Sequence, residues 1–393
     1  MNILRRATPY YALIQGLYWA IYCLMAGFAS VFLLDRGFTN GQIGLILGLS
    51  YLLSAFLQPV IGSFFSRTGV RLNLGIAWLY VPVALLSLCI LLPVGKILLA
   101  VMIVIIFTIQ SMLQPSINAL HQSFETDGQL VNFGLARGIG SAAYALSSFL
   151  VGRLLMRFSP SILPASYGIC VIVLIAVLCL ARTGDVAVRL GKAEGSSYTE
   201  ILRRHPTMGL FLLGVLCMFL TYSFIETFLV QILISIGGNS GDLGTAITLS
   251  AMTELPAMIL FSRFSRKGRG IRLFMVSIWC WLARDLLTLL APNPAALFAV
   301  QLLNFVSVAV YVPGMMDYMR HVLPETLLLR GVTMAGTAAT LGSLLATSLG
   351  GMLIDAIGVR SALAAVQLFP ACGTVLLTIA LLHAIRHPHR QER

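Results

Sequence analysis

The chain has 393 residues, of which 58% are hydrophobic and only 10% are charged. A soluble globular protein carries about 25% charged residues, so this composition excludes that class and predicts a polytopic membrane protein. The net charge of +12 would suit a nucleic-acid-binding protein, but its distribution along the chain argues against one, as described below.

Twelve hydrophobic stretches have the length of a membrane-spanning helix. The longest polar segment, residues 186–205, separates six of them from the other six. We therefore expect an N-terminal bundle over 1–185, a cytoplasmic linker over 186–205 and a C-terminal bundle over 206–393. The approximate limits of the predicted spans are 9–34, 41–65, 73–94, 97–122, 133–156, 161–181, 207–236, 243–264, 272–291, 295–318, 329–353 and 360–385.

Basic residues are unevenly divided between the two membrane faces. If the N-terminus is cytoplasmic, nineteen of the 26 Lys and Arg residues fall on the cytoplasmic face, five fall outside, and Arg137 and Arg284 lie within spans. The positive-inside rule then predicts a multi-pass protein of the inner (cytoplasmic) membrane with both termini in the cytoplasm. The positive charge is a topology signal, so we expect no nucleic-acid partner.

The first span contains Gln15, Tyr18, Trp19 and Tyr22. Aromatic faces stack on sugar rings and other flat apolar surfaces, and their polar edges donate hydrogen bonds. The alternative is an aromatic belt at the membrane surface, which fits Trp19 poorly because this residue lies deep in the span. Trp19 is therefore a candidate for solute binding.

The stretch Asn132–Gly152, which makes up most of the fifth span, is rich in Gly, Ala and Ser. Small residues let membrane helices approach closely. It carries one full charge, Arg137. An arginine inside the bilayer costs several kcal/mol, about 2.5–3.5 on insertion scales, so it must face protein or water. Two interpretations stay open: the side chain reaches the cytoplasmic headgroups, or it lines a polar cavity between helices.

Three acids lie deep in spans, Glu226, Glu254 and Asp285, and each would be costly facing lipid. They are therefore candidates for a functional site. A buried carboxyl group binds a proton more readily than an exposed one, so Glu226 and Glu254 are candidate proton carriers. For Asp285 the alternative is a packing role, paired with Arg284 or another base.

An internal repeat supports the division into six and six helices. Residues 62–74 resemble 261–273, and residues 147–155 resemble 346–354, both at an offset of 199. We expect an all-α membrane protein with twelve transmembrane helices in two pseudo-symmetric six-helix bundles. This is the architecture of the major facilitator superfamily.

Within that superfamily the chain resembles the lactose permease branch, the oligosaccharide:proton symporters. FGLARGIGSAAYALSSFLVG, residues 133–152, resembles the fifth helix of that family, in which an arginine binds sugar hydroxyls and an aromatic residue seven positions later stacks on the sugar. The resemblance implies these roles for Arg137 and Tyr144. In helix four the family has Pro-x-x-Glu, whereas this chain has Pro115 and Asn118, so an amide replaces the acid.

The C-terminal half resembles the family in helices seven, eight and nine. LTYSFIETF (220–228) resembles T-Y-D-x-x-D, which places Glu226 at the second aspartate. MTELPA (252–257) resembles M-G-E-L, which places Glu254 at the carboxylate that selects the sugar. Arg284 falls at the arginine next to the family's proton site.

Helix ten departs from the family. Its Lys-x-x-His-x-x-Glu run appears here as Gln301, Asn304 and Ser307, which carry no ionisable group. Whether protons are coupled to transport is therefore left open. Because the expected lysine partner of Glu226 is Gln301, we expect Glu226 to lack that cation and to bind a proton.

These observations predict a secondary transporter that moves a small polar solute by alternating access. The solute classes that we expect are saccharides, glycosides and nucleosides. The alternatives are a sugar or drug efflux transporter, and a transporter-like sensor that binds solute without net flux. The predicted substrate-binding residues are Arg137, Tyr144, Asn118, Glu254 and Trp19, and the predicted proton-coupling or charge network is Glu226, Arg284 and Asp285.

No enzyme motif is present: the sequence has no Walker A, GxSxG or HExxH run. The seven cysteines lie in hydrophobic runs without a CxxC pair, which predicts core residues rather than disulfides or metal ligands. We therefore expect no enzymatic activity, no cofactor and no metal. The expected partners are the solute, the lipid bilayer and, if transport is coupled to them, protons; we expect a monomer.

The topology can be tested by cysteine-accessibility labelling in intact cells. Cysteines introduced near Lys192 and Lys267 should be cytoplasmic, and those near Asp242 should react with an impermeant reagent from outside, because the basic loops stay inside. Labelling of segment 186–205 from outside would overturn this topology.

Overall fold

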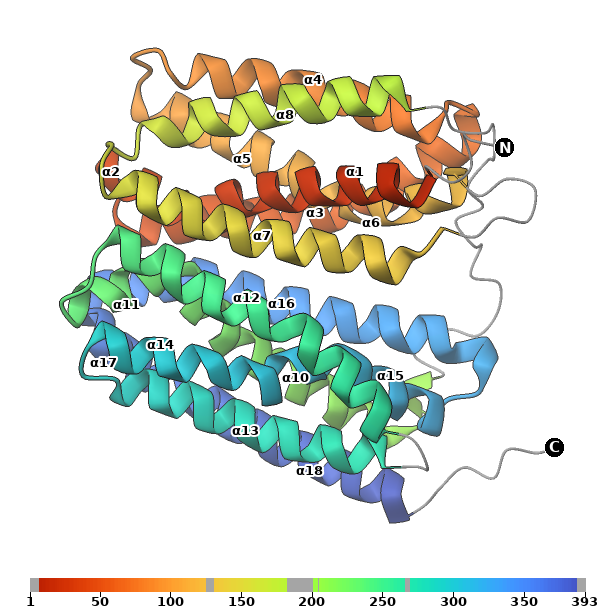
Figure 1. Cartoon of the computed structure of the whole chain (residues 1–393). Helices are drawn as coiled ribbons and strands as arrows, with labels where there is room; N and C mark the ends of the chain where they lie inside the picture. Colours follow the sequence, from red (N-terminus) through yellow and green to blue (C-terminus); the bar gives the residue numbers. More distant parts are fainter. Residues whose placement is uncertain (1–6, 125–130, 182–200, 204, 266–268, 387–393) are drawn as a thin grey trace. The chain divides into compact units, whose positions relative to one another are not determined.

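The computed structural model describes residues 7–124, 131–181, 201–203, 205–265 and 269–386. Nearly all of these residues are helical, and they form two compact units (Figure 1). One unit lies within residues 1–192 together with 243–248, and the other within 193–242 together with 249–393. Most of the predicted linker, 186–205, lies outside the described residues.

Each unit is built from helices that run along one another (Figure 1). The first contains α1 (Ala7–Tyr22), the π-helical turn η2 (Cys23–Gly27), α2 (Ala29–Asp35), α3 (Asn40–Thr68), α4 (Leu72–Cys89), α5 (Lys96–Met112), α6 (Gln114–Ala119), the 3-10 turn η3 (Leu120–Phe124), α7 (Phe133–Leu155) and α8 (Ile162–Leu180). The second contains α10 (Pro206–Thr227), α11 (Leu229–Ser235), α12 (Ser240–Phe264, residues 243–248 excepted), α13 (Gly270–Leu290), α14 (Pro294–Leu302), the 3-10 turn η5 (Leu303–Val306), α15 (Val308–Val322), α16 (Glu325–Ile357), α17 (Val359–Val366) and α18 (Leu368–Arg386).

The helices have the lengths and composition of membrane spans. Among the described residues, eleven helices are long and apolar enough to cross a membrane. A twelfth span consists of Ala7–Gly27 and Ala29–Asp35, which meet at an angle of 43°. Large apolar side chains such as Phe56, Trp78 and Ile97 are exposed, as expected where helices face lipid. The predicted all-α architecture with twelve spans is confirmed.

Five of the twelve spans are interrupted along their length. Helix one breaks at Phe28, helix four at Leu113, helix seven at Phe228, helix ten over 303–307 and helix twelve at Gln367. In helix four the break is followed by Pro115 in the first turn of α6, where a proline is tolerated because its missing N–H would have no partner within the helix. Hydrophobicity continues across all five breaks, so a span count from the sequence does not show them.

The first and seventh helices repeat the same backbone pattern 200 positions apart. Each breaks at a phenylalanine, continues in a seven-residue helix, turns at a glycine with positive φ, and ends in a residue whose side chain caps the next helix through a reciprocal capping box. The corresponding residues are Phe28 and Phe228, Gly37 (φ 74°) and Gly237 (φ 84°), Thr39 and Asn239, and Gln42 and Asp242. The repeat seen in the sequence is therefore also a repeat of backbone geometry.

Small residues allow close packing within each unit. α7 packs along α1 in the first unit, and α16 packs along α10 in the second. A Cβ atom at Gly140 would lie 2.5 Å from Cδ1 of Trp19, so this glycine lets the indole ring lie against the backbone of α7. The same close approach of α1 and α7 brings Trp19 close to the polar residues of α7.

Candidate functional site

In the first unit a buried glutamine connects two helices, α1 and α6. Gln15 is fully buried, and its Nε2 donates to Oη of Tyr11 at 2.5 Å and to Oδ1 of Asn118 on α6 at 3.2 Å. Its Oε1 accepts a bond from Nε1 of Trp19 at 3.1 Å. Tyr11, Gln15 and Trp19 are spaced four residues apart and share one face of the helix. Both ends of the amide are used, which fixes the orientation of the Trp19 ring.

Arg137 packs on that ring. The Cζ atom of Arg137 lies 3.9 Å from the centroid of the Trp19 ring, a cation–π contact, and Nη1 donates to Oγ of Ser141 at 2.8 Å. The ring of Tyr144 meets that of Trp19 edge-on, with centroids 6.3 Å apart. A guanidinium held by an indole ring and a hydroxyl group of its own helix favours the cavity interpretation of Arg137 over reach to the headgroups.

The structure therefore brings together four of the predicted substrate-binding residues: Trp19, Asn118, Arg137 and Tyr144. They form a continuous chain of contacts through Gln15. We refer to these five residues as the aromatic cluster. It presents a cation, two aromatic rings and two amides, a set of groups that can stack on a ring and bond to its hydroxyl groups.

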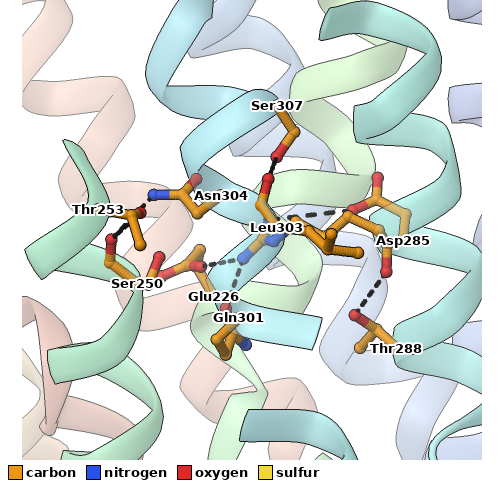
Figure 2. A network of polar contacts seen from close by, with 10 residues as sticks. Glu226, Ser250, Thr253, Asp285, Thr288, Gln301, Leu303, Asn304 and Ser307 are labelled. Atoms are coloured by element: carbon orange, nitrogen blue, oxygen red, sulfur yellow. Dashed lines mark hydrogen bonds and ion pairs between the residues drawn. The ribbon is translucent and has the colours of Figure 1, made fainter. Parts of the chain in front are cut away.

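In the second unit the central group is the guanidinium of Arg284 on α13, which is fully buried. Its Nη2 donates to Oε1 of Gln301 at 2.7 Å and lies 3.5 Å from Oε1 of Glu226. Its Nη1 lies 4.0 Å from Oδ1 of Asp285. Figure 2 shows Glu226 and Gln301 on one side of this network and Asp285 on the other. The predicted charge network of Glu226, Arg284 and Asp285 is thus brought together in space; we call these three residues the charge triad.

The structure shows which cation lies beside Glu226. With Gln301 in place of the family's lysine, we expected Glu226 to lack that lysine. Arg284 reaches the carboxylate instead, from helix nine. Gln301 accepts a hydrogen bond from the same guanidinium, so the helix-nine arginine is the cation beside Glu226 and the helix-ten position is a neutral amide.

The break in helix ten brings its neutral polar residues into hydrogen bonds. Nδ2 of Asn304 donates to the carbonyl oxygen of Ser250 on α12 at 3.1 Å, and Oγ of Ser307 donates to the carbonyl oxygen of Leu303 at 2.7 Å (Figure 2). Mid-helix 3-10 turns often mark functional hinges. The family that this chain resembles has ionisable groups at three positions of helix ten. Here these positions hold Gln301, Asn304 and Ser307, which form hydrogen bonds through amide and hydroxyl groups.

Glu254 lies on α12 directly after Thr253, whose Oγ1 donates to the same Ser250 carbonyl at 2.6 Å. Its side chain is half-buried. It is thus on the helix that Asn304 contacts, four positions after Ser250.

Two contacts were not predicted from the sequence. Ser141 bonds to Arg137, and its position four residues later on the same helix could have indicated the pair. Gln367, at the break of helix twelve, donates from Nε2 to the backbone oxygen of Asp285 at 3.2 Å. No local pattern indicates this second contact, because it depends on how helix twelve packs on helix nine. Among the described residues, no group of three or more His, Cys, Asp or Glu could hold a metal ion.

The sequence matches one family model and one curated protein. The model of the MFS_1-like family matches residues 11–365. The uncharacterized transporter YwbF of Bacillus subtilis (strain 168) is 21% identical over 363 residues, which cover 90% of this chain and 88% of that protein.

Solved transporter structures share the fold. The nucleoside transporter NupG aligns with a TM-score of 0.79 at 12% identity, over 98% of this chain and 100% of that one. A bacterial homologue of the lysosomal transporter Spinster, inward-facing and unoccupied, aligns with a TM-score of 0.71 at 13% identity over the whole of both chains. An auto-inhibited peptide transporter of the POT family aligns with a TM-score of 0.72 at 13% identity, over 99% of each chain.

The aromatic cluster makes a testable prediction about Arg137. Arg137→Lys keeps the charge but loses the planar fork of five donors, so we expect solute affinity to fall by about tenfold or more, the equivalent of one charge-assisted hydrogen bond. Binding is measured as thermal stabilisation of the purified protein by the best ligand from a screen of saccharides, glycosides and nucleosides.

Arg153→Lys is the matched control. Arg153 lies on the same helix, is exposed, and stacks on Phe149 at 5.1 Å, so its replacement should leave affinity and yield unchanged. Wild-type affinity in Arg137→Lys would show that this arginine serves as a headgroup anchor.

Proposed function

We propose that this chain, which belongs to the MFS_1-like family and is a multi-pass membrane transporter of the major facilitator type, moves a small polar solute across the cytoplasmic membrane by alternating access. The distribution of basic residues supports a cytoplasmic location for both termini. We further propose that it acts as a monomer and catalyses no chemical reaction.

The observation that carries this proposal is the aromatic cluster. Membrane helices rarely hold an arginine, and this one is packed on an indole whose own N–H is already bonded to Gln15. An interior cation with aromatic walls is costly to maintain unless it binds something. The cluster therefore supports solute binding more than it supports a purely structural role.

The chemistry of the cluster favours a ring-shaped solute that carries hydroxyl groups. Trp19 and Tyr144 supply ring faces and edges, Arg137 donates from several N–H groups, and Asn118 provides an amide. Saccharides, glycosides and nucleosides all combine a ring with hydroxyl groups. The fold that this chain shares with a nucleoside transporter keeps nucleosides within this group. Glu254 on α12 is a further proposed substrate-binding residue.

Proton coupling is proposed for the charge triad. Glu226 is the member whose side chain is partly exposed, at 32%, and it is therefore the proposed point of proton exchange with water. In this proposal Glu226 binds and releases the coupled proton beside Arg284, and transport is symport of solute and proton.

A flux assay distinguishes this function from the other candidates. Purified protein in liposomes should take up the radiolabelled solute that stabilises it best, and an imposed proton gradient should drive its accumulation. Binding without flux would indicate a sensor. Accumulation of solute driven only by an outward-directed proton gradient would indicate exchange of solute for protons, as in an efflux transporter.

Glu226→Gln tests the coupling residue. We expect loss of accumulation driven by a proton gradient, because glutamine binds no proton, while counterflow of the solute down its own gradient continues. The matched control is Asp35→Asn, which removes an exposed acid at the end of α2 and should accumulate solute as wild type does. If Glu226→Gln accumulates as well as wild type, Glu226 is not the carrier. If wild type does not respond to a proton gradient, transport is facilitated or is coupled to another ion.

A further inference from the structure

Two carboxyl groups approach the same buried guanidinium group (Figure 2). With Glu226, Arg284 and Asp285 all ionised, the charge triad carries a net charge of −1. Arg284 and Asp285 are both fully buried within the second unit. An unbalanced charge in the interior of a membrane protein is costly, so one more positive charge is needed there.

The neighbouring elements bring no such charge to the triad in the described part of the chain. The side chains that contact it from other elements are neutral: Gln301 on α14, Gln367 between α17 and α18, and Tyr222 on α10, whose ring centroid is 6.0 Å from Cζ of Arg284. On α15, Tyr311 packs against Trp281, one turn before Asp285. The amides and phenols leave the charge of the triad unbalanced.

The charged groups of the same elements lie elsewhere along them. Asp317 of α15 packs against Gly270, at the opposite end of α13, and Arg360 of α17 donates to the backbone oxygens of Leu289 and Ala291, at the end of α13 beyond Asp285. His383 and Arg386 lie in the last turn of α18. Arg330 of α16 precedes Gly331, which packs near Met208 at the start of α10, whereas Glu226 lies at the end of that helix. Glu254 is an acid and supplies no positive charge.

The distances show which carboxylate the guanidinium prefers in this structure. Nη2 of Arg284 is 3.5 Å from Glu226, whereas Nη1 is 4.0 Å from Asp285. Both carboxyl oxygens of Asp285, and Nη1 and Nε of Arg284, are buried and have no hydrogen-bond partner among the described residues. The guanidinium thus has unused donors beside an acid with unused acceptors, and a small rotation would bring them together.

From this geometry we propose that the charge triad is a binding site for one proton, which the two carboxyl groups hold in turn. In the arrangement seen here Glu226 is ionised and paired with Arg284, and Asp285 carries the proton. In the second arrangement the proton has left Asp285 and is bound to Glu226, and Arg284 has turned to the ionised Asp285. Each arrangement has one proton and no net charge.

The two acids have different roles in this exchange. The side chain of Glu226 is 32% exposed and can exchange its proton with water, whereas Asp285 is fully buried and stores it. The role of the exchange in transport rests on the proposed function. The proton site itself does not, so its test uses no solute and no flux.

The test is the pH dependence of thermal stability of the purified full-length chain in lipid nanodiscs. Stability that comes from a bound proton is complete at low pH and is lost as the proton leaves, so the wild-type Tm should fall as the pH rises from about 6 to about 9. Glu226→Gln and Asp285→Asn should each flatten this dependence, because one acid and one guanidinium balance without a proton. Asp35→Asn, at an exposed acid, should keep the wild-type slope.

The double variant Glu226→Gln/Asp285→Asn tests the exchange itself. It leaves Arg284 without an anion, so its Tm should fall by more than the sum of the two single changes, and adding Arg284→Gln should restore part of the loss. Equal pH slopes in wild type and both single variants would overturn the proton site. An additive double variant would overturn the exchange, as would a slope that changes in only one single variant.

Infrared spectroscopy supplies a second readout that does not depend on unfolding. Wild type should show the carbonyl stretch of a protonated carboxyl group, and each single variant should lose it, since the remaining acid then pairs with Arg284. A band that survives in both variants would contradict the proposal. So would a Tm that responds to sodium ions at constant pH and not to pH, because the balancing charge would then be a metal cation.

Discussion

A guanidinium group that solvent does not reach is the strongest constraint on the second unit. Arg284 is fully buried on a helix whose outer face is apolar. An arginine side chain in a protein carries a positive charge and five N–H donors, so the surrounding helices must supply acceptors or negative charge. Glu226, Gln301 and Asp285 do so from α10, α14 and α13 itself. Gln301 does so from the last turn of α14, just before the 3-10 turn of helix ten.

The first unit holds its interior arginine by a different arrangement. Arg137 lies on the face of Trp19 and bonds to Ser141 of its own helix. The indole can take this position because Gly140 has no side chain and Gln15 fixes the indole N–H. One unit thus holds its cation largely by an aromatic ring, and the other by carboxylates. This difference in chemistry separates a group suited to solute binding from a group suited to proton binding.

The breaks in the helices are part of the architecture and are not local accidents. Those at Phe28 and Phe228 recur at equivalent positions of the two halves, with the same turn and the same type of cap after them. Backbone groups released at a break must find partners inside a membrane protein, so such breaks are tolerated only where protein or water surrounds them. In helix ten Gln301, just before the break at 303–307, contacts Arg284, and in helix twelve the break falls at Gln367, which bonds to the backbone of Asp285.

The sequence by itself determined the number of spans, the twofold repeat and most of the chemically important residues. These follow from local properties: a span is a run of apolar residues, and a charge inside such a run is costly whatever its neighbours are. Arg137, Glu226, Arg284 and Asp285 were recognisable on this ground alone. Only the tertiary structure decided which of them meet. That Arg284 reaches Glu226, that Gln15 joins Trp19 to Asn118, and that Gln367 bonds to the backbone of Asp285 depend on the packing of helices far apart in the chain. The helix breaks were also decided there, because apolar composition is the same on both sides of a break, while backbone direction depends on the neighbours that satisfy its polar groups.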